Sequence, residues 1–350
     1  PSTSVDTETS IKILSDVEFT LNGIYSTMQS SDAYSGRLVY YGDVTGDDMQ
    51  AVSSTKRVAN YYRFNFTKDD NPSSHWSYLY SIIQNCNLIL MNIDKLVIDE
   101  DDKAYRDDLK GEALAIRGLA LFDLTRIFGY PYLKDNGASL GVPIIEGLST
   151  IDSKPTRNTV AQCYTKIIDD LTQSLSLLGE KFNKGKINKW GAMVLLSRVY
   201  LYKGENANAL KMASDAITGA EKNKYALWTN EDYPTAWGED ASASKPGEVL
   251  FEIVNLTTDS PGKESMGYLN SYDGYDDMCI TCSFYQFLKE DPKDIRLKLL
   301  SFDKKYYAYV NKYQPQREEN IEDANIPLIR LSEAYLNAAE AAVKENDNDA

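Results

Sequence analysis

The amino-acid sequence predicts a mainly α-helical protein in which paired helices form a scaffold and an irregular, loop-rich insertion interrupts it. Three observations predict this fold class. Apolar residues recur at helical spacing over much of the chain, a segment near residue 200 recurs near residue 340, and few segments have the composition of strands. The stretch between the two copies is rich in Tyr, Trp, Gly, Asp and Pro.

The composition is that of an ordinary folded protein with an acidic balance. The 350 residues include 37 Lys+Arg and 52 Asp+Glu, which gives a formal net charge of −15. Phosphate binding needs clustered basic residues, so this balance argues against a nucleic-acid partner. No apolar run reaches the roughly 18 residues of a membrane-spanning helix. Because His75 is the single histidine, a His-rich metal site is excluded and any His-dependent catalyst rests on this residue.

Three helices are predicted in the N-terminal part of the chain. Apolar residues recur at three- and four-residue steps over 11–28, 76–93 and 109–128. The third pattern stops at Gly129-Tyr130-Pro131, where glycine can adopt the left-handed cap and proline cannot continue the helix.

Three further helices follow. Thr159 and Gln162 have the spacing of a capping box, and the apolar face of the fourth helix extends from there to Leu178. The fifth helix covers 190–204, and the sixth, around 209–217, follows after a turn of a few residues. So short a connection forces the two helices to be antiparallel neighbours.

The fifth helix and its turn recur 141 positions later. Residues 199–209 can be laid over 340–350, and Trp190 then falls over Leu331. Small inner residues followed by Lys, a polar turn and Ala resemble a tetratricopeptide helix pair. The last residue falls where the second helix of the final pair is expected to begin. Either the chain stops early or this closing helix is missing from the sequence.

Residues 225–320 are predicted to be an irregular insertion between the two repeat units. Only the segment from Ser283 to Glu290 has a helical period. The best strand candidate is 247–254, which is short, β-branched and bounded by Pro246-Gly247. A second candidate strand covers 304–313.

The cysteines and acidic clusters give weak signals for metal chemistry. Cys86 and Cys163 lie in apolar helical patterns and are predicted to be core residues. Cys279 and Cys282 have the spacing of a redox or zinc half-site, but no second pair exists, and their apolar neighbours favour packing. His75, which directly precedes a helix, is predicted to be a surface or capping residue.

Calcium is the one cofactor that the sequence leaves open. Two acidic groups could coordinate it through oxygens, namely Asp43-Asp47-Asp48 and Asp347-Asp349. Neither matches a calcium-binding loop with its glycine and closing glutamate, so we expect no cofactor.

Five segments in order resemble the SusD/RagB family, the nutrient-binding lipoproteins of the outer membrane in Bacteroidetes. The helix from Glu112 to Pro131 closely resembles that family's E-A-x-x-x-R helix. The other four segments are, in chain order, Trp76–Asn87, Thr156–Val160, Trp190–Gly204 and Ile326–Asn337. Together the matches run from about residue 75 to 345.

The resemblance implies a single SusD-like domain over 1–350 with a tetratricopeptide-like scaffold. That scaffold would comprise about 8–30, 74–130, 158–220 and 326–350, and the ligand-binding portion about 31–73 and 225–320. The family implies anchoring by a lipidated N-terminal Cys on the extracellular face of the outer membrane. The signal peptide and this Cys are absent here. It also implies an oligosaccharide ligand, handed without catalysis to a SusC-like TonB-dependent transporter.

Glycan capture needs flat aromatic faces and paired polar groups in a shallow groove. The chain has 25 tyrosines, and several lie in the two loop-rich portions that the resemblance implies. The candidate ligand-binding residues are Tyr40, Tyr41, Asp43, Tyr62, Trp237, Tyr272 and Tyr275. Asp43 is the preferred polar candidate because it follows two tyrosines in a turn-like segment, whereas Trp76 and Trp190 are expected in the core.

Three alternatives stay open. A peptide-binding member of the same family would have the same scaffold. A glycoside hydrolase needs two carboxylates at fixed separation, which 52 acidic residues cannot exclude. A cytosolic repeat protein that binds peptide termini would need basic side chains along its helical groove. Here the face around 194–202 is apolar with Arg198 as its lone charge, which argues against the third alternative.

Overall fold

The computed structural model describes residues 11–67, 73–150, 152–238, 246–303, 307–315 and 320–345. Its helices are α1 (Leu14–Met28), α2 (Arg37–Val44), α3 (Ala59–Tyr62), α4 (Ser73–Asn92), α5 (Lys103–Phe128), α6 (Val160–Leu175), α7 (Lys189–Lys203), α8 (Asn206–Lys222), α9 (Met266–Leu269), α10 (Cys282–Lys289) and α11 (Leu331–Glu345). Its strands are β1 (Met49–Ala51), β2 (Val249–Ile253), β3 (Met278–Ile280), β4 (Leu300–Phe302), β5 (Ala308–Val310) and β6 (Ile326–Arg330). The predicted fold class, mainly α with a tetratricopeptide-like scaffold, is confirmed.

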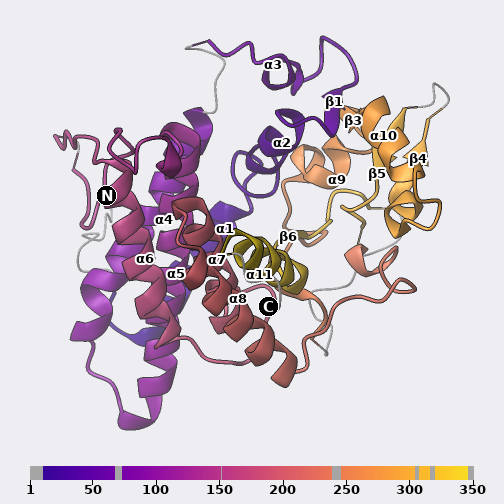
Figure 1. The fold of residues 1–350 in the computed structure, drawn as a ribbon. Helices are drawn as coiled ribbons and strands as arrows, with labels where there is room; N and C mark the ends of the chain where they lie inside the picture. Colours follow the sequence, from indigo (N-terminus) through magenta and orange to yellow (C-terminus); the bar gives the residue numbers. More distant parts are fainter. Residues whose placement is uncertain are drawn as a thin grey trace.

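The long helices pack side by side in chain order and form one half of the molecule (Figure 1). α5 packs against α4 and α6, α7 against α6 and α8, and α11 against α8 and α7. The predicted recurrence is therefore a structural one, since α7 and α11 pack against the same partner helix, α8, and also contact each other. Small buried residues such as Ala209 and Ala213 on α8 and Ala341 on α11 let the helices approach closely.

The ends of α6 and α7 follow the signals in the sequence, whereas Gly129 after α5 has a φ of −111° and is extended, not left-handed as predicted. The Thr159 hydroxyl accepts a hydrogen bond from the Gln162 N–H at 3.2 Å, and the Thr159 N–H donates to Gln162 Oε1 at 2.9 Å, which confirms the capping box. Asn188 caps α7 by accepting from the Gly191 N–H, and Gly204 ends α7 with a φ of 81°. α5 begins earlier than predicted, at Lys103, because its first turn is exposed and charged and therefore carries no apolar period.

The signature residues of the resemblance form the buried polar contacts of this scaffold. Arg117 on α5 donates to both carboxylate oxygens of Asp170 on α6, at 2.8 and 2.6 Å, and to the side-chain oxygen of Asn87 on α4 at 2.8 Å. Asn87 in turn donates to the carbonyl oxygens of Ile145 and Gly147. These residues hold three helices together and are not available to a ligand.

Glu112 makes the stability of the protein depend on pH. It is 4% exposed, accepts a hydrogen bond from the Tyr25 hydroxyl at 2.7 Å, and burial raises its pKa to about 7. The folded state therefore holds the Glu112 proton more tightly than the unfolded state, whose pKa is near 4.5. The stabilisation is complete below about pH 4.5 and is lost as pH rises through 7.

We expect Glu112→Gln to remove this part of the pH dependence. A neutral amide can still accept from Tyr25 and has no proton to lose, so up to about 3 kcal/mol of the change between pH 4.5 and 7 should disappear. Urea unfolding at pH 5 and pH 8 measures the difference for both proteins. An equal slope in wild type and variant would show that Glu112 does not titrate in this range.

The second half of the molecule is a loop-rich lobe built from two distant parts of the chain. β1 pairs antiparallel with β3, with Met49 opposite Ile280, so the segment around residue 50 lies against the segment around residue 280 (Figure 1). β4 and β5 form a hairpin with Leu300 opposite Val310. β2 pairs with β6, which leads directly into α11 and ties the lobe to the scaffold.

The lobe is more ordered than the predicted irregular insertion. The predicted strand at 247–254 is confirmed as β2, and the predicted helix at 283–290 as α10. Part of the second candidate strand is β5, whereas 304–306 lie outside the described residues. α2, α3 and α9 were not predicted, because they are short and lack an apolar stripe of several turns.

The prediction for His75 is wrong. Its side chain is 1% exposed, its Nδ1 lies 3.0 Å from the Asp32 carbonyl oxygen, and its ring packs edge-on against Tyr41. Burial lowers its pKa. The imidazole is covered by Asp32 and Tyr41, which are distant in the chain, and sequence periodicity does not reveal such contacts.

The other predictions for core residues are largely right. Cys86, Cys163 and Trp190 are buried, whereas Trp76 is half-buried between Tyr80 and Phe128. Cys279 is buried and Cys282 is exposed at the start of α10.

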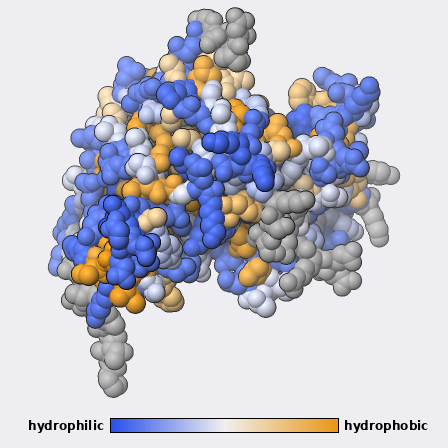
Figure 2. Space-filling model, turned by 90° about the horizontal axis from the view of Figure 1, so that it is seen from below, coloured by the Kyte–Doolittle hydropathy of each residue, from blue (hydrophilic) through white to orange (hydrophobic). Residues whose placement is uncertain are grey.

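The face seen from below is mainly hydrophilic, with hydrophobic residues in separate patches (Figure 2). Exposed apolar side chains include Phe19, Val97 and Leu336. Single apolar residues of this kind are normal on folded proteins. In the part of the chain that the structure describes, no helix has both the length and the apolar character needed to cross a membrane.

Candidate functional site

Two adjoining cavities in the loop-rich lobe share a wall formed by Asn270, Val310 and Tyr313. The first, which we call the charged cavity, has a volume of about 320 Å³. Its polar lining is Asp43, Asp48, Asn270, Arg296, Lys312 and Tyr313. The second, the amide cavity, has a volume of about 430 Å³, and its polar lining includes Asn270, Ser271, Asn311 and Gln314. Both volumes are in the range of sites for small ligands.

Strand pairing brings these side chains together. Asp43 is at the end of α2, and Asp48 directly precedes β1, whose pairing with β3 carries both to the lobe. Lys312 and Tyr313 follow β5, and Arg296 precedes β4, so the β4–β5 hairpin places them on neighbouring segments. Asn270 follows α9, where Gly267 is required because a Cβ there would collide with the Ile321 carbonyl oxygen.

Asn270 has a buried acceptor with no partner. The residue is 4% exposed, and its Nδ2 donates to the Val310 carbonyl oxygen at 2.7 Å. Its Oδ1 makes no hydrogen bond with any described residue. Leaving a buried acceptor unsatisfied costs about 1–3 kcal/mol. Because Asn270 lines both cavities, a donor on a molecule that enters them would remove this cost.

Lys312 and Asp43 are opposite charges that face the same cavity without forming an ion pair. Among the described residues, the Lys312 ammonium has no carboxylate within 4.0 Å and lies 5.1 Å from the Trp237 ring. Burial lowers the pKa of Lys312, as do the cations of Arg330 and Arg296, whereas Asp43 raises it. Desolvation raises the pKa of Asp43, and Lys312 lowers it.

The Tyr313 hydroxyl completes the set of donors. Burial raises the pKa of Tyr313, so the phenol keeps its proton at all physiological pH values. Its hydroxyl makes no hydrogen bond within the described part of the chain. The cavities thus present unpaired donors from Lys312 and Tyr313 and unpaired acceptors from Asp43 and Asn270, which suits a ligand rich in hydroxyl groups.

Two of the sequence-predicted ligand-binding residues are corrected. Tyr40 is 2% exposed and packs against Tyr61, so it is a core residue. Trp237 is 6% exposed and lies between Trp228 and Tyr233, with ring centroids 5.0 and 5.6 Å away. Tyr40 belongs to the hydrophobic core that continues into the scaffold, whereas Trp237 packs within a cluster of three aromatic rings.

The other predicted residues are distributed over the lobe. Asp43 lines the charged cavity, and Tyr272, 46% exposed, follows Ser271 of the amide cavity. Tyr275 is half-buried beneath the Arg57 guanidinium, 3.8 Å from the ring centroid. Tyr41 is half-buried against Tyr61 and His75. Tyr62 is exposed on α3 and is not among the residues that line the two cavities.

Sequence reasoning missed Asn270, Arg296, Lys312 and Tyr313. No motif surrounds them, and their only signal is that they fall in the portion predicted to bind ligand. In the part of the chain that is described, no three His, Cys, Asp or Glu side chains are grouped to hold a metal. The second acidic group considered for calcium, Asp347-Asp349, lies outside the described residues.

A scaffold of helical repeats with polar cavities built from loops is typical of a protein that binds small ligands. Two family models match the chain: one described as "Starch-binding associating with outer membrane" matches residues 2–201, and one described as "SusD family" matches residues 294–350. The chain belongs to the SusD/RagB family.

Known proteins of similar fold come from Bacteroides. A solved protein from Bacteroides vulgatus, named as a candidate sugar-binding protein, is 83% identical with a TM-score of 0.95, over 97% of this chain and 76% of that one. A SusD superfamily protein from Bacteroides thetaiotaomicron is 36% identical with a TM-score of 0.89, over 97% of this chain and 77% of that one. A SusD-like protein from Bacteroides ovatus is 27% identical over 38% of this chain and 23% of its own length. The chain spans less than half the length of the curated relatives it matches.

Proposed function

We propose that this protein captures oligosaccharides non-covalently in the charged and amide cavities. The observation that carries the proposal is the buried, unpartnered Oδ1 of Asn270, which lies in the wall common to both cavities. A sugar hydroxyl is both a donor and an acceptor, so it can satisfy Asn270 while it accepts from Tyr313 or Lys312.

The surroundings of the cavities suit a sugar ring. Tyr272 has an exposed ring and directly follows Ser271, which lines the amide cavity, and an aromatic face packs well against the C–H face of a pyranose. Lys312 and Arg296 supply charged donors, and Asp43 and Asp48 supply charged acceptors. The family description as starch-binding, and the name of the 83% identical protein, favour a carbohydrate over a peptide.

We further infer that capture is one step of uptake. Members of the family associate with the outer membrane, and a surface binding protein needs a route by which its ligand enters the cell. The proposed partner is a SusC-like TonB-dependent transporter, with the protein lipid-anchored on the extracellular face. Co-purification of the membrane-anchored full-length protein with an outer-membrane transporter tests this step, and its absence after gentle solubilisation would count against it.

The binding step is tested with a glycan array followed by calorimetric titration of the best oligosaccharide. We expect a saturable signal without new reducing ends, because the protein holds its ligand and does not cleave it. Binding to peptides alone would support the peptide-binding alternative. New reducing ends would support a glycoside hydrolase.

Tyr272→Ala should weaken oligosaccharide binding about 5- to 20-fold without a change in Tm. The ring is exposed and its residue follows Ser271 of the amide cavity, so its removal takes away stacking and leaves no void in the core. Tyr62→Ala is the matched control, since Tyr62 is also an exposed tyrosine of the lobe but is not next in the sequence to a residue that lines the two cavities. Equal affinities of the two variants and the wild type would remove Tyr272 from the site.

A further inference from the structure

A third cavity, of about 390 Å³, lies between α2 and the helical scaffold and shares no lining residue with the charged and amide cavities. We call it the arginine cavity. α2 supplies one wall, α5 and α7 supply the opposite walls, and β6 closes the end. Gly42 and Tyr202 lie at the exposed part of this lining, so the cavity opens to solvent.

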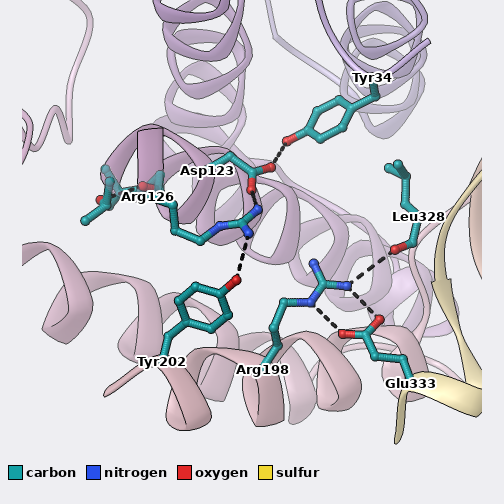
Figure 3. A network of polar contacts seen from close by, with 9 residues as sticks. Tyr34, Asp123, Arg126, Arg198, Tyr202, Leu328 and Glu333 are labelled. Atoms are coloured by element: carbon teal, nitrogen blue, oxygen red, sulfur yellow. Dashed lines mark hydrogen bonds and ion pairs between the residues drawn. The ribbon is translucent and has the colours of Figure 1, made fainter. Parts of the chain in front are cut away.

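One end of the cavity holds the Arg198 guanidinium in a fixed orientation. Its Nε and Nη2 donate to the two carboxylate oxygens of Glu333, at 2.5 and 2.7 Å, and Nη2 also reaches the Leu328 carbonyl oxygen at 3.4 Å. Its third nitrogen, Nη1, makes no hydrogen bond within the described residues. Figure 3 shows this nitrogen directed into the space between Arg198, Arg126 and Tyr34.

The Arg126 guanidinium is held above the same space. It pairs with Asp123, and it packs against the rings of Phe122 and Tyr202, 4.7 and 5.4 Å from their centroids. Asp123 also accepts from the Tyr34 hydroxyl at 2.7 Å. Each oxygen of the Asp123 carboxylate therefore accepts one hydrogen bond, from Arg126 or from Tyr34. Arg126 Nε has no partner in the part of the chain that the structure describes.

The lining carries an excess of positive charge. Arg126, Arg198 and Asp123 line the cavity, whereas the Glu333 carboxylate lies behind Arg198 and outside the lining. The rest of the wall is apolar, with Leu38, Val39, Leu119, Ile127, Leu328 and Ile329.

We propose that the arginine cavity is a second binding site, for a carboxylate carried on a compact and partly apolar body. The carboxylate accepts from Arg198 Nη1 and is attracted by the Arg126 guanidinium, and the body of the ligand packs between the aliphatic walls. Guanidinium groups are suited to this role because their charge persists at all pH values and their donors are fixed in a plane. The site is independent of oligosaccharide capture in the lobe.

Two pairs of probes test the charge requirement and the source of the carboxylate. Phenylacetate and phenylacetamide differ only in charge on an apolar body, and D-glucuronate and D-glucuronamide do the same on a sugar. Ligand-observed NMR titration of the whole protein should detect at least one acid bound at least about tenfold more tightly than its amide. If only phenylacetate binds, the ligand of the cavity is an apolar acid. If only glucuronate binds, the ligand is an acidic sugar. Equal affinity for acid and amide, or no binding of either acid, overturns the proposal.

Gly42→Phe tests the location without disturbing the arginines. A Cβ at Gly42 meets no atom within 4 Å, so a larger side chain can be placed at the mouth of the cavity. Gly23→Phe is the matched control, because Gly23 is an exposed glycine within α1 whose Cβ position is equally open. We expect acid binding to be lost in Gly42→Phe and retained in Gly23→Phe. Retained binding in Gly42→Phe overturns the assignment to this cavity.

Arg198→Lys tests the donor itself. Lysine keeps the positive charge next to Glu333 but lacks the planar guanidinium, so it cannot hold one donor on Glu333 and a second donor at a fixed position in the cavity. Affinity for the acid should fall at least about tenfold while the affinity for oligosaccharide stays unchanged. An unchanged affinity for the acid would mean that the charge of the region, and not the fixed Nη1, holds the ligand.

Discussion

Asp170→Ala should destabilise the protein by about 3–5 kcal/mol, the largest stability effect we expect from a single polar residue. Asp170 is fully buried, accepts two hydrogen bonds from Arg117, and lies 3.2 Å from the Lys166 ammonium. Its removal leaves the Arg117 guanidinium buried without a counter-charge between α4, α5 and α6. Urea unfolding followed by circular dichroism measures the loss.

Asp169→Ala is the matched control for this prediction. Asp169 precedes Asp170 on α6 but is exposed, and its contact with Lys166 is 4.0 Å long. A surface pair of this kind contributes less than about 1 kcal/mol. If Asp170→Ala were as stable as Asp169→Ala, the network around Arg117 would not be what joins the three helices.

Lys312→Met should abolish most oligosaccharide affinity and leave the protein as stable as the wild type or more stable. The ammonium is a charged donor without a carboxylate partner in the described residues, and a hydrogen bond to a charged group contributes about 1.5–3 kcal/mol, or roughly 10- to 150-fold in affinity. Methionine fills a similar volume and has no charge to desolvate. Calorimetric titration and thermal unfolding of the same samples measure both effects.

The control for Lys312→Met is Lys222→Met, at an exposed position on α8. It should change neither affinity nor Tm. A variant of Lys312 that bound sugar normally would exclude the charged cavity from the site, whatever its stability.

The directions of the pKa shifts set the pH dependence of binding. The pKa of Lys312 is below its ordinary value of 10.5, so affinity is lost as pH rises through this lowered pKa and the donor loses its charge. The pKa of Asp43 is above its ordinary value of 3.8, so affinity is lost as pH falls through that raised pKa. We therefore expect binding to be strongest between the two values.

The scaffold could be predicted from the sequence because its physical signals are local. An apolar stripe, a capping box at Thr159 and Gln162, and a glycine at the end of α7 each act within a few residues. The motifs that carry the family resemblance are of the same kind, since Arg117 and Asn87 hold helices together. They identify the fold and contain no information about the ligand.

The candidate site could be predicted only as a region. Asn270 is held in place by a hydrogen bond to Val310, 40 residues away. Lys312 and Asp43 line the same cavity because β1 pairs with β3. Tyr40 and Trp237 were placed at the surface because aromatic residues in a loop-rich segment suggest exposed rings. Tyr40 is buried in the core shared with the scaffold and Trp237 in an aromatic cluster, and composition cannot distinguish such packing from a binding surface.

A crystal structure of the protein with the oligosaccharide that binds best in the array tests the central claim most directly. We predict sugar density in the charged and amide cavities, with a hydroxyl within hydrogen-bond distance of Asn270 Oδ1 and another near Tyr313 or Lys312. Density that lies elsewhere on the protein, with Asn270 Oδ1 still unpartnered, would contradict the assignment of the site.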